Sequence, residues 1–186
     1  MNKQEQRNRA KVARESLSEC DREIFNSVVS ERLLNLPAVA SASTIMSYMA
    51  FGAELNLEAF HEEILRAGKT LAFPVTYGEG RMEAYVPQGD DAWSTGVFGI
   101  RTPMPEKSLL IDPKNFDLII VPCLAFDKDK MRIGWGGGYY DRYLPRCNKA
   151  HKIAVAYEVQ RVDRVASDPT WDVALDKVVT ENKIYE

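Results

Sequence analysis

The chain has little cysteine and little histidine. Its three cysteines, Cys20, Cys123 and Cys147, are odd in number and far apart, and no Cys-x-x-Cys pair occurs. This pattern gives neither a disulfide framework nor a zinc motif, and it is typical of reduced thiols in a cytoplasm. The only two histidines, His61 and His151, have no chemical partner nearby in the sequence, so we expect structural or surface roles for them.

Long apolar runs and a strong charge of one sign are also missing. No apolar run approaches the roughly 20 residues that a membrane-spanning helix needs, and the basic N-terminus has no apolar core after it, unlike a secretory signal. The net charge of −3 and the pI near 5.6 give no general reason to expect nucleic acid or an acidic membrane as a partner. With 186 residues, 45% of them hydrophobic, the chain fits a single soluble domain over residues 1–186, and we expect a cytoplasmic monomer.

Helical and strand patterns alternate along the sequence. Residues 3–35 have a helical pattern in which Ser18 and Asp21 have the spacing of a capping box, and Asn56 and Gly68 are residue types that begin and end a second helix. A short helix is expected at 139–144, and strands are expected at 43–51, 70–75, 82–87, 118–121, 152–157 and 177–181. The alternation predicts a three-layer α/β/α domain with a largely parallel sheet.

One stretch concentrates the glycines of the chain. The sequence RIGWGGGYYDRYL, residues 132–144, holds four of the eleven glycines between Gly134 and Gly138, directly before the short predicted helix. Such a loop lets main-chain N–H groups approach an anion, and phosphate is the usual anion at a helix start. Arg132 could pair with phosphate oxygens and Asp141 could hold a magnesium ion, whereas the alternative is a turn that only connects two elements.

Two familiar nucleotide-binding motifs do not fit this stretch. No Gly-Lys-Ser/Thr follows the glycines, so the segment is not a Walker A loop. A G-x-G-x-x-G dinucleotide fingerprint fails because position 139 is tyrosine and because the segment lies far from the N-terminus.

The same stretch resembles the signature of the 5-formyltetrahydrofolate cyclo-ligase family. That signature is Arg-x-Gly-x-Gly-x-Gly-Tyr-Tyr-Asp after a strand ending in Pro-x-x-x-Phe-Asp, which VPCLAFD at 121–127 matches at Pro122, Phe126 and Asp127. Further similar blocks are KQEQR near the start, YMAFGAELN around Glu54, FGIRTP at 98–103 and LDKVVTE near the end. They follow the family's order over nearly the whole chain, and the resemblance implies a mixed, largely parallel sheet like that of sugar-phosphate isomerases and CoA-transferases.

The resemblance also implies an activity. The family uses ATP and Mg²⁺ to convert 5-formyltetrahydrofolate, with or without a polyglutamate tail, to 5,10-methenyltetrahydrofolate, releasing ADP and phosphate. The formyl oxygen is a poor leaving group, so transfer of the γ-phosphoryl group to it prepares the attack by N10. Such a step needs positioning and charge neutralisation rather than a protein nucleophile.

The family's functional positions fall on specific residues of this chain. The ATP-binding positions match Lys3, Gln4, Glu5, Gln6, Arg7, Arg132, Ile133, Gly134, Trp135, Gly136, Gly137, Gly138, Tyr139 and Tyr140. The folate-binding positions match Met49, Glu54, Trp135, Gly136, Gly137, Gly138 and Tyr139. The resemblance implies metal ligation by Asp141 and Asp176 and catalytic roles for Arg132, Tyr139 and Asp141. Without the resemblance, Lys3 and Arg7 would indicate only a solvated helix face.

The chain departs from the family at one phosphate-facing position, and two other functions stay open. Gly137 stands where some relatives have lysine, and Arg132, Lys128 or Lys130 could supply the missing charge. The alternatives are a non-catalytic relative that binds nucleotide or folate, and a sugar-phosphate isomerase or transferase on the same fold.

Overall fold

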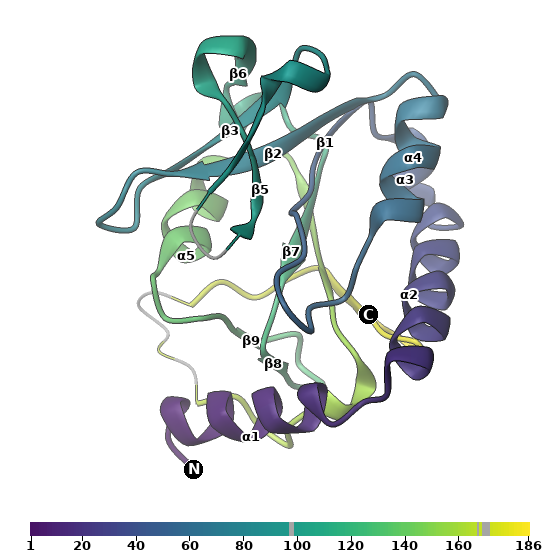
Figure 1. Cartoon of the computed structure of the whole chain (residues 1–186). Helices are drawn as coiled ribbons and strands as arrows, with labels where there is room; N and C mark the ends of the chain where they lie inside the picture. Colours follow the sequence, from purple (N-terminus) through teal and green to yellow (C-terminus); the bar gives the residue numbers. More distant parts are fainter. Residues whose placement is uncertain (97–98, 167, 169–171) are drawn as a thin grey trace.

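The computed structural model describes residues 1–96, 99–166, 168 and 172–186, and Figure 1 shows their arrangement. The α-helices are α1 (Lys3–Glu15), α2 (Glu19–Leu34), α3 (Pro37–Ser41), α4 (Glu58–Arg66) and α5 (Tyr139–Tyr143). The main sheet contains β1 (Thr44–Met46), β2 (Thr70–Thr76), β3 (Met82–Pro87), β6 (Ser108–Ile111), β7 (Leu118–Pro122), β10 (His151–Val155), β11 (Lys177–Val179) and β12 (Ile184–Tyr185). Two small sheets pair β4 (Trp93–Thr95) with β5 (Arg101–Pro103) and β8 (Ala125–Phe126) with β9 (Arg132–Ile133). The short 3₁₀ helices are η1 (Asp90–Ala92), η3 (Pro105–Lys107), η4 (Pro113–Asn115), η5 (Leu144–Arg146) and η6 (Glu158–Gln160).

The main sheet is mixed and mostly parallel, as predicted. Its order is β12-β11-β10-β7-β1-β2-β3-β6, with parallel pairing from β11 to β2 and antiparallel pairing at both edges. From β1 the chain passes to its neighbour β2, whereas from β7 it passes to β10 on the other side, so the strand order reverses between β1 and β7. In open α/β sheets, ligands bind at the carboxyl ends of the strands beside such a reversal.

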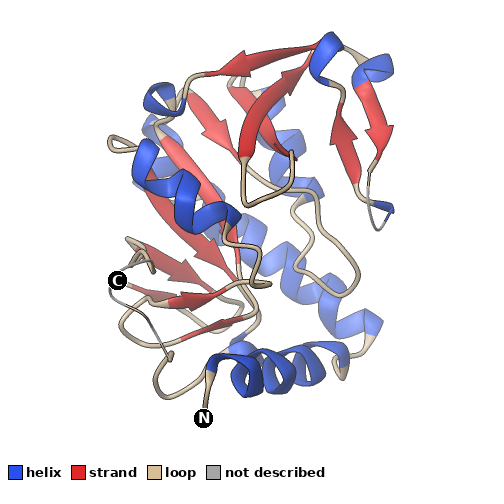
Figure 2. Ribbon diagram, turned by 90° about the vertical axis from the view of Figure 1, so that its left-hand side faces the viewer, coloured by secondary structure: helices blue, strands red, loops and turns tan. Residues whose placement is uncertain are grey.

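Helices cover both faces of the sheet (Figures 1 and 2). Alternate side chains of β7 point to opposite faces, because successive residues of a strand alternate. Leu118 and Ile120 pack in one core with α2, α3 and α4. Ile119 and Val121 pack in the other core with Tyr143 of α5 and Leu144 of η5. The predicted three-layer α/β/α architecture is therefore confirmed.

Helix α1 lies apart from these two layers, next to the β8–β9 hairpin (Figures 1 and 2). A small apolar cluster joins them, in which Ala10 packs with Ala125, Ile133 and Val165. The hairpin follows β7, so this packing brings α1 to the carboxyl end of the central strand. α1 is thereby placed beside the strand-order reversal.

Two of the predicted elements differ most from their expected bounds. The helix expected at 3–35 is interrupted, because Ser16 ends α1 and the Ser18 hydroxyl accepts the Asp21 main-chain N–H to begin α2. The strand expected at 43–51 ends at Met46, and the Tyr48 hydroxyl then donates to the Leu55 carbonyl oxygen over 2.6 Å, which holds the following residues in a loop. Phe98, the first residue of the FGIRTP block, lies outside the described residues. None of the helices described has the length and apolar character needed to cross a membrane.

Candidate functional site

A pocket of about 310 Å³ lies between α1 and the glycine loop. Its walls come from the N-terminal half of α1, from the segment that follows β9, from the start of α5 and from the segment before β11. The lining residues are Lys3, Arg7, Arg132, Ile133, Gly134, Gly136, Gly138, Asp141, Arg142 and Asp172. The structure thus brings together residues that are far apart in the sequence, and most of them are predicted ATP-binding positions.

Two ion pairs cross this pocket. The Lys3 ammonium lies 2.6 Å from Asp172 Oδ2, and the Arg132 guanidinium donates to Asp141 Oδ1 over 2.8 Å. The Arg132 side chain is only 3% exposed, and its Nε has no hydrogen-bond partner among the described residues. Each carboxylate is therefore held by a cation and faces the pocket.

Two further cations of the pocket bind main-chain oxygens of the glycine loop. Arg7 Nε donates to the Gly134 carbonyl over 2.9 Å, and Arg142 Nη1 donates to the Gly137 carbonyl over 3.2 Å. Neither guanidinium has a described ion pair with a carboxylate. With four basic and two acidic side chains, the pocket has positive charge that its own carboxylates do not neutralise.

The glycine loop has the conformation that an anion site needs. Gly136 has φ 98° and Gly138 has φ 68°, which are values that residues with a Cβ rarely adopt. Within the described part of the chain, the main-chain N–H groups of 134–138 donate no hydrogen bond. Helix α5 is only five residues long, so its dipole is small and these loop amides would be the main attraction for a phosphate.

A second group of side chains lies beside the loop, at the carboxyl end of β1. Trp135 Nε1 donates to Glu54 Oε1 over 2.8 Å, and the Phe51 main-chain N–H donates to Glu54 Oε2 over 3.0 Å. The Trp135 ring is half exposed, whereas the Glu54 side chain is only 7% exposed. A flat exposed ring beside a buried carboxylate suits a planar heterocycle with N–H donors.

The remaining predicted aromatic and apolar positions are Met49, Tyr139 and Tyr140. Met49 is half-buried and packs on the core that contains Tyr48. The Tyr139 ring packs so closely on Gly137 that a Cβ there would lie 2.7 Å from it. Burial raises the pKa of the Tyr140 phenol well above its usual range, and the Arg132 guanidinium carbon lies 5.4 Å from the centroid of its ring. Tyr140 is therefore a neutral support for Arg132.

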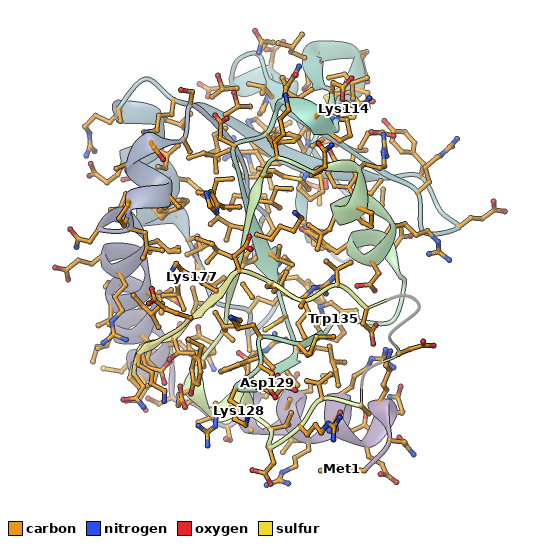
Figure 3. The ribbon with its side chains drawn as sticks, turned by 180° about the vertical axis from the view of Figure 1, so that it is seen from behind. Met1, Lys114, Lys128, Asp129, Trp135 and Lys177 are labelled. Atoms are coloured by element: carbon orange, nitrogen blue, oxygen red, sulfur yellow. The ribbon has the colours of Figure 1, made fainter. Side chains whose placement is uncertain are left out.

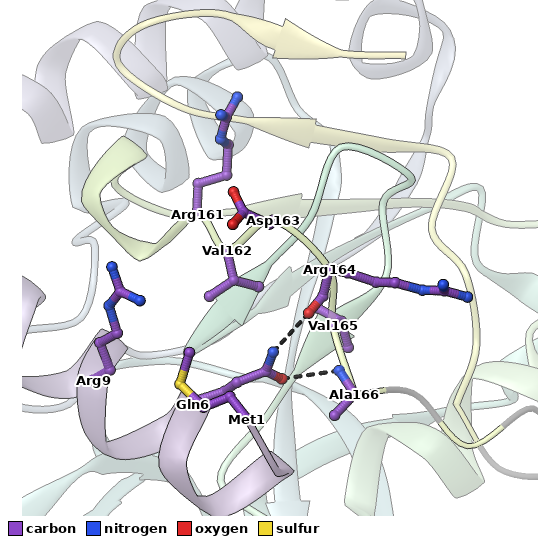
Figure 4. A pocket seen from close by; sticks show the side chains of 9 residues that line it. All are labelled: Met1, Gln6, Arg9, Arg161, Val162, Asp163, Arg164, Val165 and Ala166. Carbon is purple, nitrogen blue, oxygen red and sulfur yellow. Dashed lines mark hydrogen bonds between the residues drawn. The ribbon is translucent and has the colours of Figure 1, made fainter.

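Three of the predicted ATP-binding residues on α1 are engaged in local structure. Gln4 binds Asn8 and Arg7, and Glu5 forms a capping box with Asn2 at the helix start. Gln6 is buried and points into a different pocket of about 540 Å³, where its amide binds the Arg164 carbonyl and the Ala166 N–H (Figure 4). The structure thus orients only Lys3 and Arg7 of this segment toward the glycine loop.

Asp176 lies apart from the other predicted metal ligand. Asp176 Oδ2 accepts the Lys152 main-chain N–H over 2.7 Å, at the amino end of β10, and Asp176 does not line the pocket that contains Asp141. Asp172, four residues earlier, lines that pocket. No group of three histidine, cysteine, aspartate or glutamate residues that could hold a metal occurs in the described ranges. Two carboxylates are nevertheless enough for Mg²⁺ when phosphate oxygens and water complete its shell.

Sequence reasoning missed three residues of this region. Arg142 and Asp172 line the pocket between α1 and the glycine loop, and Arg14 contacts both Glu54 and Trp135. Arg142 was within the signature stretch, and it supplies a charge beside Gly137, where some relatives have lysine. Lys128 instead pairs with Asp129 on an exposed turn (Figure 3). Arg14 lies seven residues after Arg7, which places both on the same side of a helix, and this spacing was the sequence signal that could have indicated Arg14.

Comparison with known proteins agrees with this geometry. The model of the 5-formyltetrahydrofolate cyclo-ligase family matches residues 1–181. The 5-formyltetrahydrofolate cyclo-ligase of Escherichia coli (strain K12) is 30% identical over 161 residues, which cover 83% of this chain and 87% of the relative. The relative from Haemophilus influenzae, with the same name, is 29% identical over 153 residues, covering 79% of this chain and 80% of its own length.

Solved structures give the same result. The NMR structure of Aquifex aeolicus 5,10-methenyltetrahydrofolate synthetase superposes with a TM-score of 0.87 at 32% identity, covering 100% of this chain and 93% of the other. A synthetase from Mycoplasma pneumoniae, at 23% identity, shares the fold with a TM-score of 0.80 over 97% and 99% of the two chains. The family match over almost the whole length removes the isomerase or transferase alternative. The chain belongs to the 5-formyltetrahydrofolate cyclo-ligase family.

Proposed function

We propose that the pocket between α1 and the glycine loop binds the triphosphate of ATP, while the folate lies against Trp135 and Glu54. With both bound, the protein catalyses the reaction of its family, the ATP-dependent conversion of 5-formyltetrahydrofolate to 5,10-methenyltetrahydrofolate. The observation that carries the proposal is the pairing pattern of the pocket. Arg7 and Arg142 are cations without a described carboxylate partner, and they lie beside loop amides that donate to no described group.

The proposed chemistry joins the two halves of the site at the glycine loop. Transfer of the γ-phosphoryl group to the formyl oxygen turns that oxygen into part of a phosphate leaving group. N10 then attacks the formyl carbon, the carbon–oxygen bond breaks, and inorganic phosphate departs with the oxygen. Trp135 borders the folate half and Gly136 borders the phosphate half, so adjacent residues of one loop hold the two reacting groups.

Arg132, Asp141 and Tyr139 have distinct roles in this proposal. The buried Arg132 guanidinium can neutralise charge that develops on the phosphoryl oxygens. Its hydrogen bond to Asp141 fixes the direction of both side chains. The Tyr139 ring rests on Gly137 and holds the loop in shape.

We also propose that Asp141 and Asp172 hold the magnesium ion. Support comes from their position, since both line the pocket that Arg7 and Arg132 make positive, and Asp176 does not. The ion supplies charge neutralisation at the phosphate oxygens when it is bound. Lys3, now paired with Asp172, would then be free to contact a phosphate oxygen.

Location and assembly are proposals as well. We propose a single cyclo-ligase domain that acts as a monomer in the cytoplasm. Burial raises the pKa of Cys123 to about 12 and that of Cys147 to about 11, so both thiols stay protonated and unreactive. The exposed large apolar side chains Val12, Ile24 and Leu65 come from three different helices.

The experiment that tests the function is a turnover assay. Purified protein is mixed with 5-formyltetrahydrofolate, Mg²⁺ and ATP, and the near-ultraviolet absorbance of the methenyl product is followed. The proposal requires product that depends on ATP, with one phosphate released for each product formed. A folded protein that binds both ligands without turnover would support the non-catalytic alternative, and equal turnover without ATP would refute the mechanism.

A further inference from the structure

Helix α1 carries three basic side chains on one face. Lys3, Arg7 and Arg14 are four and then seven residues apart, spacings that return to the same side of an α-helix. The eleven residue-to-residue steps from Lys3 to Arg14 span roughly 16 Å of helix axis. Lys3 and Arg7 line the phosphate pocket, and Arg14 reaches the Glu54–Trp135 pair. Helix α1 therefore contributes side chains to both halves of the site.

Arg14 is a buried charge with few partners. Its side chain is only 3% exposed, and its Nε makes no hydrogen bond with a described residue. The one ion pair described for it is with Glu54, where Nη1 lies 4.0 Å from Oε1, longer than a hydrogen bond. A buried guanidinium with unmade hydrogen bonds costs stability, so its retention calls for a functional explanation.

The same guanidinium lies over the Trp135 ring. Its central carbon is 5.5 Å from the ring centroid, within the range of a cation–π contact. Arg14 thus contacts both members of the Glu54–Trp135 hydrogen bond and comes from a different element than either of them. The Arg14 guanidinium attracts the Glu54 carboxylate by its charge and lies over the face of the Trp135 indole ring.

The geometry points to Arg14 as a positioning residue for the folate substrate. This inference rests on the proposed function, because it takes Glu54 and Trp135 as the folate-binding pair. An ionised carboxylate has about four acceptor positions, and the Trp135 and Phe51 N–H groups occupy two of those on Glu54. Arg14 orients the carboxylate so that the remaining positions face a ring with N–H donors, and it keeps the indole plane in place beside them.

The inference predicts a selective kinetic change. Arg14→Met keeps an apolar stem and removes the charge, and its KM for 5-formyltetrahydrofolate should rise by about tenfold, because the Glu54 carboxylate and the Trp135 ring lose the cation that orients them. The KM for ATP should stay close to that of the wild type, because Arg14 does not line the phosphate pocket. Arg14→Lys should recover part of the folate affinity through its charge, without the stacking geometry. Arg9→Met, on an exposed part of the same helix, is the matched control and should change neither KM.

A double-mutant cycle separates positioning from a merely structural role. If Arg14 acts through Glu54, Arg14→Met combined with Glu54→Gln should be no weaker in folate binding than Glu54→Gln alone. Folate binding is measured without ATP, by equilibrium dialysis, on variants whose circular dichroism matches the wild type. If Arg14→Met does not fold, Arg14→Lys takes its place in the cycle. An unchanged folate KM in the folded variant, or effects that simply multiply in the cycle, would overturn the inference while leaving wild-type turnover intact. If the wild type shows no turnover although Arg14 and Glu54 are coupled in folate binding, the proposed function is refuted instead.

Discussion

Trp135 and Glu54 are 81 positions apart in the sequence, yet Trp135 Nε1 donates to Glu54 Oε1 over 2.8 Å. This hydrogen bond connects the glycine loop to the segment that follows β1. Trp135 of the glycine loop is therefore the residue that the two halves of the proposed site have in common. Phosphate is expected on one side of the loop and folate on the other. The relationship leads to predictions for each half.

Trp135→Phe removes the N–H donor and keeps a flat ring. We expect the KM for 5-formyltetrahydrofolate to rise several-fold, roughly 3- to 10-fold for one lost hydrogen bond to a charged acceptor. The affinity for ATP should not change, because the indole N–H points to Glu54 and away from the pocket cations. Steady-state kinetics with each substrate varied in turn measures both constants, and Trp93→Phe serves as the control. A rise in the ATP constant alone would contradict the division of the site.

Gly136→Ala tests whether the loop conformation matters for function beyond stability. At φ 98° an alanine is strained, and we expect a loss of about 1–2 kcal/mol in the free energy of unfolding. The added Cβ would also lie 3.4 Å from the Arg7 guanidinium, so turnover should fall as well. Gly78→Ala, at φ 81° in open space, should cost similar stability with normal turnover. Equal activities of the two variants at equal stability would show that the loop only connects elements.

Substitutions of two aspartates near β11, Asp172 and Asp176, should have different effects on the magnesium dependence of turnover. If Asp172 is a magnesium ligand, Asp172→Asn should raise the Mg²⁺ concentration for half-maximal turnover by about tenfold or more. Asp176→Asn should affect stability more than magnesium dependence, because its carboxylate accepts the Lys152 N–H. Magnesium titrations of both variants at saturating ATP decide between them. The reverse outcome would restore the ligand assignment made from the sequence.

Burial of His61 predicts a pH-dependent stability. Removal from water lowers the pKa of His61 from 6.5 to about 4, and Ser47 Oγ lies 2.7 Å from its Nε2. The unfolded chain therefore binds a proton between these pH values that the folded chain does not, so stability falls as the pH drops from about 6.5 to 4. The loss should reach about 3 kcal/mol at the lower limit. Denaturant unfolding across this range should show a weaker dependence in His61→Gln than in the wild type or in His151→Gln, an exposed control. Parallel curves for all three proteins would rule out His61 as the cause.

The sequence predicts the architecture well where patterns are local. The apolar run of β7, the cap of α2 by Ser18 and the glycines around 136 each depend on neighbouring residues, and all were found as expected. Strand β6 was missed because its residues Leu109 and Leu110 are adjacent and both exposed, so no alternation marks it.

The site is less predictable because its contacts are long-range. Asp172 meets Lys3 across 169 positions, and no local pattern distinguishes it from Asp176 four residues later. Arg14 is one of several basic residues on α1, and only its burial against Glu54 separates it from its exposed neighbours. Residue types near a motif indicate the chemistry, whereas the packing of α1 on the β8–β9 hairpin decides which of them take part.

The central claim is that Arg7 and the glycine loop bind the triphosphate of ATP. Calorimetric titration of Mg²⁺–ATP into the wild type, Arg7→Met and Arg9→Met tests it most directly. We predict one site per chain in the wild type, an affinity at least about tenfold lower in Arg7→Met, and no change in Arg9→Met. Equal affinity in Arg7→Met and the wild type would contradict the account.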